Sequence, residues 1–456
     1  MKVMPFVHEG LGNSSYLVDL GEGQALVVDP DRSIQRYLQL AEARGLRIVA
    51  LLETHLHADF VSGARELAHA TGARILLPAG EQAKFPHEAI EAGQRLRLAS
   101  ADIEALASPG HTPEHLAYVL RSARQPPQLF SGGALIVGGA ARTDLISPDL
   151  TESLTRSLFH TVHQVFAALP DNTILYPTHG GGSFCSTGAG GERISTLGRE
   201  RASNPLLRQT EQEEFVRWLP RTFPAAPDYF FRLRAFNQAG PRLRGEIPSP
   251  RPLSADEFAE ALAAGAIVID VRSKEEYSLA HVPNAISNPL RDVYATWLGW
   301  LVPPDLPLLF VTDGVRLEDV VAESLLVGYE RFVGWLQGGI TAWQASGRPV
   351  AEVRLVDAQA ARRAIVDGAE ILDVRESDEF ASGHIEGALQ LPLGRLQDVA
   401  ATLPKGRPLV AYCGHGERAS TAASLLERAG LGPLLNLDGG IEAWRAAGYP
   451  IFTNGS

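Results

Sequence analysis

Short apolar runs alternate with amphipathic stretches along the first half of the chain. The apolar runs have the length and composition of buried strands, and they cover residues 16–20, 25–28, 48–52, 103–107, 116–120 and 174–176. Between them, helical spacing predicts helices near 34–44, 62–70 and 151–168, the first of them capped by Ser33 and ended by Gly45. This pattern predicts a mixed α/β domain over residues 1–220.

The second half of the chain contains an internal repeat. Residues 254–272 match residues 357–375, and each segment has a helical pattern followed by an apolar run that ends in Asp-Val-Arg. The match returns at Gly-Gly-Ile-x-Ala-Trp near the end of each repeat. Strands that alternate with helices in this way predict two homologous α/β domains with parallel sheets, at 253–350 and 354–454.

A proline-rich segment separates these two halves. Seven prolines lie between residues 220 and 252. Because proline lacks a backbone N–H and disrupts helix interiors, we expect an extended connector over 221–252 without a regular helix.

Composition and net charge argue against several classes of function. The chain of 456 residues carries 41 Lys+Arg against 53 Asp+Glu, a net charge of −12, which argues against nucleic acid and anionic membranes as partners. No apolar run approaches the length of a membrane span, and the first ten residues lack the apolar core of a signal peptide. With only two cysteines there is no disulfide framework. We therefore expect a cytoplasmic protein whose two thiols deserve a chemical explanation.

Four histidines and one aspartate follow three of the predicted strands in the first domain. They are His55, His57, Asp59, His111 and His179. Since strand ends meet at one rim of a sheet, these side chains are expected to converge, and imidazoles with a carboxylate suit zinc or ferrous iron. The alternative is a polar network without a metal.

Cys185 follows His179 by six residues, in a glycine-rich segment. It is either a buried small hydrophobic residue or a catalytic thiol beside the metal cavity that carries sulfane sulfur.

The second thiol, Cys413, stands between the predicted strand 409–412 and the helical pattern 419–429. A helix N-terminus and its free N–H groups favour a thiolate and an anionic substrate. We therefore predict Cys413 as the nucleophile with Arg418 as a catalytic cation. The intervening loop, predicted to bind substrate, consists of Gly414, His415, Gly416 and Glu417.

This loop, with Asp-Val-Arg and Gly-His-Ile-x-Gly-Ala, resembles the rhodanese family, whose motif is C-x-x-G-x-R. The resemblance implies sulfur transfer through a persulfide on Cys413; a phosphate or arsenate reaction and an inert thiol are the alternatives. In the first repeat Asp313 is expected at the cysteine position, which predicts a silent domain that acts as a spacer or a dimer surface. The Asp-x-Arg pairs and the histidines shared by both repeats are expected to be structural.

The segments H-x-H-x-D, SPGHTPEH, ARTDL and YPTHGGGSFC resemble the metallo-β-lactamase family, and its persulfide dioxygenase branch in particular. This resemblance implies an αββα sandwich. Phe60 replaces the final histidine of H-x-H-x-D-H, and Gly133 replaces the aspartate that binds iron in that branch. The implied ligands are then His55, His57 and His111, with Asp59 and His179 nearby. One Fe(II) or Zn(II) per chain is expected, and Gly133 leaves its occupancy open.

Together these features predict a sulfur-metabolism enzyme: a thiosulfate or persulfide sulfurtransferase coupled to a metal-dependent persulfide dioxygenase domain that produces sulfite. Its partners would be thiosulfate or a low-molecular-weight thiol persulfide, and the family resemblance favours a homodimer or tetramer. Two alternatives stay open. The first domain could be a metal-poor scaffold of a sulfur carrier, or the protein could be a glyoxalase II-like thioester hydrolase.

Overall fold

The computed structural model describes residues 1–122, 125–186 and 191–453. It separates into two compact units. The first comprises Met1–Ile247 with Ala322–Gly328, and the second comprises Pro248–Val321 with Tyr329–Ser456. Residue 454, where the last predicted domain ends, lies outside the described residues. Among the described helices, none is both long enough and apolar enough to span a membrane.

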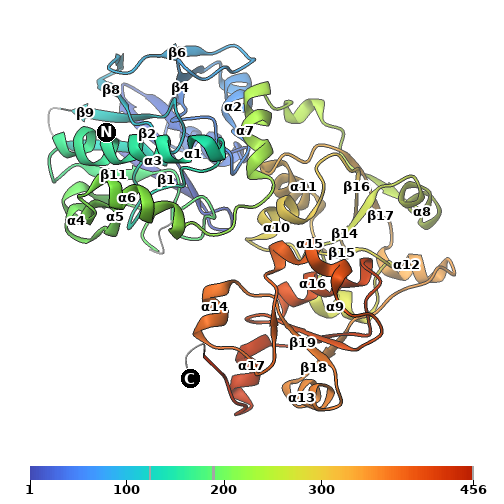
Figure 1. The fold of residues 1–456 in the computed structure, drawn as a ribbon. Helices are drawn as coiled ribbons and strands as arrows, with labels where there is room; N and C mark the ends of the chain where they lie inside the picture. Colours follow the sequence, from blue (N-terminus) through green and yellow to red (C-terminus); the bar gives the residue numbers. More distant parts are fainter. Residues whose placement is uncertain (123–124, 187–190, 454–456) are drawn as a thin grey trace. The chain divides into compact units, whose positions relative to one another are not determined.

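Two six-stranded sheets form the centre of the first unit (Figure 1). The strands of one sheet, in spatial order, are β1 (Lys2–His8), β2 (Asn13–Gly21), β3 (Gln24–Val28), β4 (Arg47–Leu52), β5 (Arg74–Pro78) and β6 (Glu88–Ile90). Those of the other are β12 (Ser195–Thr196), β11 (Ile174–Pro177), β10 (Gln125–Gly132), β9 (Leu116–Ser122), β8 (Ala101–Ala107) and β7 (Arg95–Leu98). A buried cluster that includes Tyr16, Phe130 and Tyr176 joins them.

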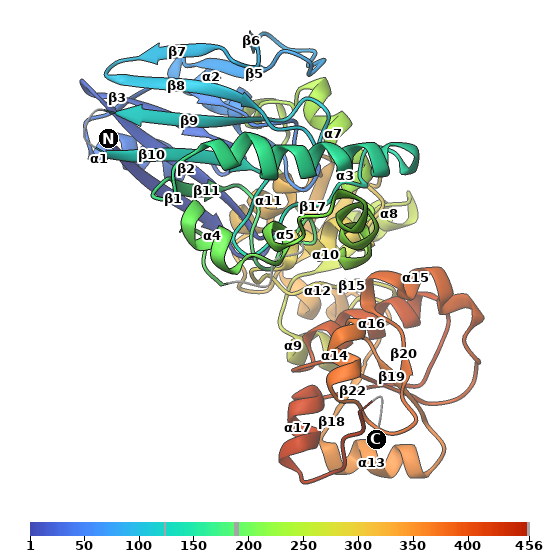
Figure 2. The same cartoon turned by 60° about the vertical axis from the view of Figure 1, so that its left-hand side comes forward.

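Helices cover the outer faces of this sandwich. Tyr37 and Ala41 of α1 (Gln35–Ala43) and Leu67 of α2 (Ala64–Thr71) join the core of the first sheet. The second sheet packs with α3 (Thr151–His160), η2 (Thr161–Val165), η3 (Phe166–Ala168), α4 (Leu197–Ser203), α5 (Pro205–Arg208) and α6 (Gln212–Trp218). The predicted αββα sandwich is therefore confirmed, as Figure 2 also shows.

Two local expectations for this unit were wrong. Ile34, not Ser33, precedes the first turn of α1, and no side chain caps that helix. The connector is not free of helix, since it contains α7 (Phe230–Ala239) between η4 (Leu219–Thr222) and η5 (Arg244–Glu246). The prolines are grouped at its two ends, and the proline-free stretch between them is long enough for a helix of ten residues.

The second unit contains two parallel five-stranded sheets with the same strand order. The first repeat consists of β13 (Arg251–Leu253), α8 (Ala255–Ala263), β14 (Ile267–Asp270), α9 (Lys274–Leu279), β15 (Ile286–Ser287), α10 (Tyr294–Leu301), β16 (Leu308–Val311), α11 (Leu317–Leu326), β17 (Phe332–Leu336) and α12 (Gly339–Ala345). The sheet order is β13-β17-β16-β14-β15.

The second repeat follows the same plan with the order β18-β22-β21-β19-β20. Its elements are β18 (Arg354–Val356), α13 (Ala358–Val366), β19 (Glu370–Asp373), α14 (Ser377–Ser382), β20 (Leu389–Gln390), η6 (Leu393–Arg395), α15 (Leu396–Val399), η7 (Ala400–Thr402), β21 (Leu409–Tyr412), α16 (Glu417–Arg428), β22 (Leu434–Leu437) and α17 (Gly440–Ala446). The two predicted parallel α/β repeats are thus confirmed.

Candidate metal centre and thiol loop

The ends of β4, β8 and β11 deliver the predicted ligands to one buried point. All five side chains, His55, His57, Asp59, His111 and His179, are at most 1% exposed. The rings of His55 and His111 have centroids 4.7 Å apart, and those of His111 and His179 are 5.2 Å apart. The convergence expected from the strand ends is therefore present.

The donor atoms form two overlapping groups. One atom from each of His55, His111 and His179 lies within 4.8 Å of the others, and a second such group contains His57, Asp59 and His179. His179 thus belongs to both groups, whereas the sequence placed it only nearby.

Several of these atoms lack a partner. Among the described residues, His55 Nε2, His57 Nδ1, His179 Nε2 and Asp59 Oδ1 are buried without a hydrogen bond. Since buried polar atoms in proteins are almost always paired, converging unpaired donors of this type fit a divalent cation of the zinc or iron class.

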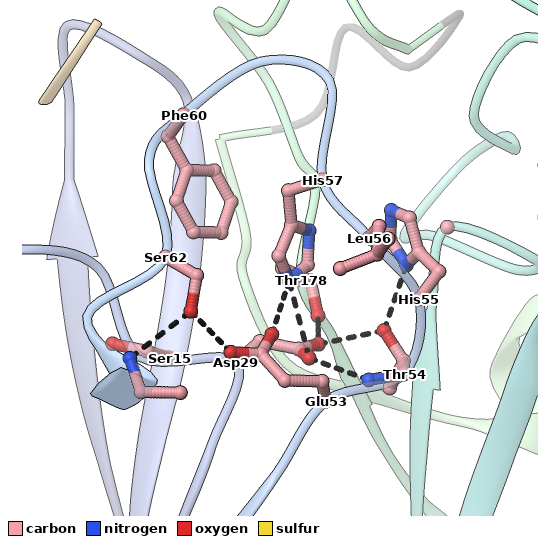
Figure 3. A network of polar contacts seen from close by, with 12 residues as sticks. Ser15, Asp29, Glu53, Thr54, His55, Leu56, His57, Phe60, Ser62 and Thr178 are labelled. Atoms are coloured by element: carbon pink, nitrogen blue, oxygen red, sulfur yellow. Dashed lines mark hydrogen bonds and ion pairs between the residues drawn. The ribbon is translucent and has the colours of Figure 1, made fainter. Parts of the chain in front are cut away.

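Two carboxylates contact the Nε2 side of the His57 ring and orient it (Figure 3). Its Nε2 lies 2.9 Å from Glu53 and 3.3 Å from Asp29. Although burial opposes the charge, the Asp29 and Glu53 carboxylates raise the pKa of His57 to about 10. The unpaired Nδ1 on the other side of the ring is the atom left for a metal, and carboxylates behind ligating imidazoles are typical of metal sites.

His55 and His111 have the opposite electrostatic environment. Burial and the charges of neighbouring histidines lower the pKa of His55, and burial and His179 lower that of His111 to about 3. The Nδ1 of His111 donates to the Arg142 carbonyl at 2.7 Å, which leaves Nε2 facing the centre. Both rings are therefore neutral, as metal ligands must be.

The two departures from the family motif have visible consequences. The Phe60 ring stacks on His57 with centroids 4.2 Å apart and brings no ligand atom. At Gly133, a Cβ would lie 2.6 Å from His111 Cδ2 and 2.9 Å from Ala141 Cβ. His111 thus occupies space that any side chain at position 133 would need, so a carboxylate cannot return there without moving it.

Cys185 lies beside the centre. Its Sγ is 3.7 Å from His111 Nε2, and the residue is fully buried. Burial, with Asp59, holds the pKa of this thiol well above its ordinary value. The thiol is therefore both buried and next to the metal ligands, so its position is compatible with either of the two roles considered for it.

Sequence reasoning missed the residues that support the ligands. Asp29 directly follows the strand β3 and Glu53 directly follows β4, so both lie at strand ends, where the predicted ligands were found. His115, four residues after His111, stacks on His55 at 5.0 Å and accepts a hydrogen bond from the Gly133 N–H at 3.1 Å.

The thiol loop of the second repeat has the predicted form. Cys413 follows β21, and its Sγ accepts a hydrogen bond from the Gly416 N–H at 3.0 Å. Gly416 has a φ of +107° and precedes the twelve residues of α16. The thiol is thus held at a helix N-terminus, where negative charge is stabilised.

The rest of the loop surrounds the thiol. Arg418 forms a two-point ion pair with Glu379, at 2.6 and 2.7 Å, which sequence reasoning did not foresee. A Cβ on Gly414 would lie 3.7 Å from this guanidinium. His415 is exposed, and its carbonyl accepts a hydrogen bond from Lys274, which also lies 3.5 Å from Glu417.

The first repeat has no thiol at the equivalent position, but the expected correspondence with Asp313 was off by one residue. Val311 pairs with Asp270 as Tyr412 pairs with Asp373. The residue after Val311 is Thr312, so Thr312 takes the place of Cys413. Asp313 instead accepts a hydrogen bond from the Ile340 N–H and lies 3.4 Å from Arg272.

Known proteins match both units. The Metallo-beta-lactamase superfamily matches residues 8–185, and the Rhodanese-like domain matches residues 254–346 and 357–447. The chain is 33% identical over 208 residues to the mitochondrial persulfide dioxygenase ETHE1 of Bos taurus, which covers 44% of the chain and 74% of that protein.

Two further matches widen the comparison. A hydroxyacylglutathione hydrolase of Pseudomonas entomophila is 30% identical over 248 residues, covering 48% of the chain and 92% of that protein. A crystal structure described as a metallo-beta-lactamase from Staphylococcus aureus has a TM-score of 0.65 and 28% identity, and it covers 74% of this chain and 98% of its own.

Proposed function

The chain belongs to the metallo-β-lactamase superfamily and carries two rhodanese-like domains after that fold; from this premise we propose that it is an enzyme of sulfane-sulfur metabolism. Cys413 acts as a sulfurtransferase nucleophile that accepts sulfur from thiosulfate or a thiol persulfide. The observation that carries the proposal is the Cys413 Sγ held 3.0 Å from the Gly416 N–H at the start of α16.

The residues of the loop have separate tasks in this transfer. The helix N-terminus and the Gly416 N–H stabilise the attacking thiolate and the persulfide anion that replaces it. Arg418, fixed by Glu379, keeps a permanent positive charge beside the sulfur. The short Cys-x4-Arg loop suits a single sulfur atom.

The experiment for this step is mass spectrometry of the intact protein after incubation with thiosulfate. We expect the mass of one added sulfur atom on the peptide that contains Cys413, removed by cyanide as thiocyanate. Sulfur found only on Cys185, or on neither thiol, would contradict the assignment.

For the first unit we propose a metal-dependent oxidation of a persulfide to sulfite. His55, His111 and His179 would hold a divalent ion, with His57 and Asp59 on its other side. The ion would supply Lewis-acid chemistry and, if it is iron, redox chemistry. Net oxidation of a persulfide by one O₂ and one water gives the thiol, sulfite and two protons. The unpaired donors His55 Nε2 and His179 Nε2 support this proposal.

A hydroxyacylglutathione hydrolase is among the relatives of this chain, but the metal centre supports thioester hydrolysis less well than persulfide oxidation. A second metal would need a ligand where Phe60 presents only a ring against His57.

Metal content tests the centre. After anaerobic loading with Fe(II) or Zn(II), wild type should retain about one ion per chain and His111→Ala should lose most of it, because too few ligands remain to offset dehydration of the ion. The exposed His160 in the same domain gives the matched control His160→Ala. Equal retention by His111→Ala and the control would overturn the ligand assignment.

A further inference from the structure

The first repeat contacts the thiol loop of the second. Helix α9 and strand β15 of the first repeat lie against α16 (Figures 1 and 2). Lys274 Nζ donates to the His415 carbonyl at 2.9 Å, and Ser287 Oγ lies 2.9 Å from Ser420 Oγ. The repeat without a thiol therefore borders the active loop directly.

Two of the cations around this loop already have counter-ions. Lys274 lies 2.9 Å from Asp438 and 3.5 Å from Glu417. Arg418 is paired with Glu379 at 2.6 Å. Their charges are therefore engaged inside the protein before any substrate binds.

Arg291 differs from both. It belongs to the first repeat, in the turn between β15 and α10. Its Nε is buried without a hydrogen bond, and in the described part of the chain its guanidinium forms no ion pair. A largely buried cation without a counter-ion costs free energy unless an anion binds to it.

The surroundings of Arg291 identify the place where that anion would bind. Arg291 follows Ser287 by four residues, and Ser287 Oγ lies 2.9 Å from Ser420 Oγ in the first turn of α16, the helix that begins at the thiol loop. Burial lowers the pKa of Arg291, and the carboxylate of Glu417 in that loop acts against this shift. Because Lys274 already engages Glu417, Arg291 is a cation of the first repeat that stays available for an anion bound at Cys413.

We propose that Arg291 of the silent repeat binds the anionic end of the sulfur donor at Cys413, so that the two repeats form one composite active site. This inference rests on the proposed sulfur transfer and names its substrate class, a donor with a doubly charged oxyanion end such as thiosulfate. The silent repeat is then part of the donor site, beyond its role as a spacer.

The transfer step shows why a second cation is needed. The Cys413 thiolate attacks the outer sulfur of thiosulfate, a new S–S bond forms, and the bond to the sulfonate sulfur breaks. Sulfite leaves with that electron pair, and Cys413 keeps the persulfide anion. The thiolate and thiosulfate together carry three negative charges before and after the step, so a guanidinium at the sulfonate lowers their mutual repulsion.

The test compares two donors on the full chain. Thiosulfate is a dianion, and methanethiosulfonate is a monoanion that transfers the same type of sulfur. For Arg291→Gln we expect the KM for thiosulfate to rise by about tenfold or more, with a smaller rise for methanethiosulfonate. Arg291→Lys keeps the charge and should keep the preference for thiosulfate. Arg316→Gln is the control, because Arg316 is an arginine of the same repeat that is 75% exposed.

The outcomes separate this inference from the proposed function. If wild type transfers sulfur and Arg291→Gln leaves both KM values unchanged, or raises them equally, the composite site is refuted while sulfur transfer stands. If wild type transfers sulfur from neither donor, the proposed function itself fails. If Arg291→Gln does not fold, the Arg291→Lys variant provides the test. This variant keeps the positive charge, so loss of its preference for thiosulfate would refute the proposal.

Discussion

The two rhodanese-like repeats share a sheet order and a set of buried contacts, yet only one of them presents a thiol. In each, the Asp-x-Arg motif forms an internal ion pair, at 2.6 Å between Arg272 and Asp270 and at 2.6 Å between Arg375 and Asp373. The two repeats thus share a buried ion pair between the aspartate and the arginine of this motif, and its structural role stays a prediction.

The two repeats also share a histidine that stacks on an aromatic ring. The His281 ring stacks on Tyr277 at 3.8 Å and its Nδ1 lies 2.8 Å from the Tyr277 carbonyl. The His384 ring stacks on Phe380 at 3.9 Å in the same arrangement. Both histidines are therefore structural, which confirms the expectation for them.

The difference that bears on sulfur chemistry lies in one loop of each repeat. Thr312 and Cys413 occupy the same register position, and a hydroxyl cannot store sulfane sulfur. The first repeat keeps the fold without the thiol, and its Lys274 contacts the thiol loop of the second repeat. Duplicated domains can therefore divide chemistry and support between them.

The largest expected effect comes from removing the thiol of the second repeat. Cys413→Ser should lower thiosulfate:cyanide sulfur transfer by at least about a thousandfold, because the covalent nucleophile is lost. The change is nearly isosteric at a buried site, so the melting temperature should stay close to that of wild type. Activity above a tenth of the wild-type rate would show that another group carries the sulfur.

Breaking the shared ion pair tests whether the two repeats depend on it equally. Asp373→Asn and Asp270→Asn should each lower the free energy of unfolding of the altered repeat by about 3–5 kcal/mol, because an arginine is left buried without its partner. Denaturant unfolding followed by fluorescence measures this loss. A large loss in one variant and none in the other would mean that the pair has a different role in each repeat.

The ion pair between Glu379 and Arg418 has no counterpart at the loop of the first repeat, and its effect should depend on pH. Arg418 outweighs burial and holds the pKa of Glu379 below its ordinary value of 4.5. The stabilisation is present above pH 4.5 and is lost as the pH falls through the lower, folded-state value. Glu379→Gln should remove this dependence, an effect of up to about 1 kcal/mol for a partly exposed pair.

Thermal unfolding of wild type and Glu379→Gln between pH 3 and 7 supplies the measurement. Parallel curves over the whole range would rule out a contribution from this pair.

The smallest expected effect is a gain of function. In the Cys413→Ser background, Thr312→Cys should acquire a persulfide detectable by mass spectrometry, with turnover below about a hundredth of wild type, since the loop lacks the other groups that assist transfer. Asp313→Cys is the matched control, because the strand register places Asp313 one residue beyond the thiol position. A stronger gain in the control would contradict the register assignment.

Local patterns in the sequence were enough to predict much of the fold of this molecule and many of its candidate site residues. The repeat, the Asp-x-Arg pairs and the thiol loop were predictable because neighbouring residues make those contacts or because the two copies could be compared. The αββα sandwich was implied by the resemblance of the histidine motifs to the metallo-β-lactamase family, and the convergence of the ligand set was expected because those motifs follow the ends of strands. The sequence also shows that the prolines of the connector lie at its two ends. The helix α7 between them was nevertheless not predicted.

Contacts between distant segments required the tertiary structure. No local pattern shows that Asp29 and Glu53 orient His57, that His179 belongs to both donor groups, or that the His111 ring fills the space at Gly133. The same holds for the ion pair of Glu379 with Arg418 and for the contact of Lys274 with the thiol loop. The sequence by itself determined which chemical groups are available, because their types and motifs are written in it. Only the packing of sheets and repeats decided which of those groups meet, because burial and charge at each site depend on residues far apart along the chain.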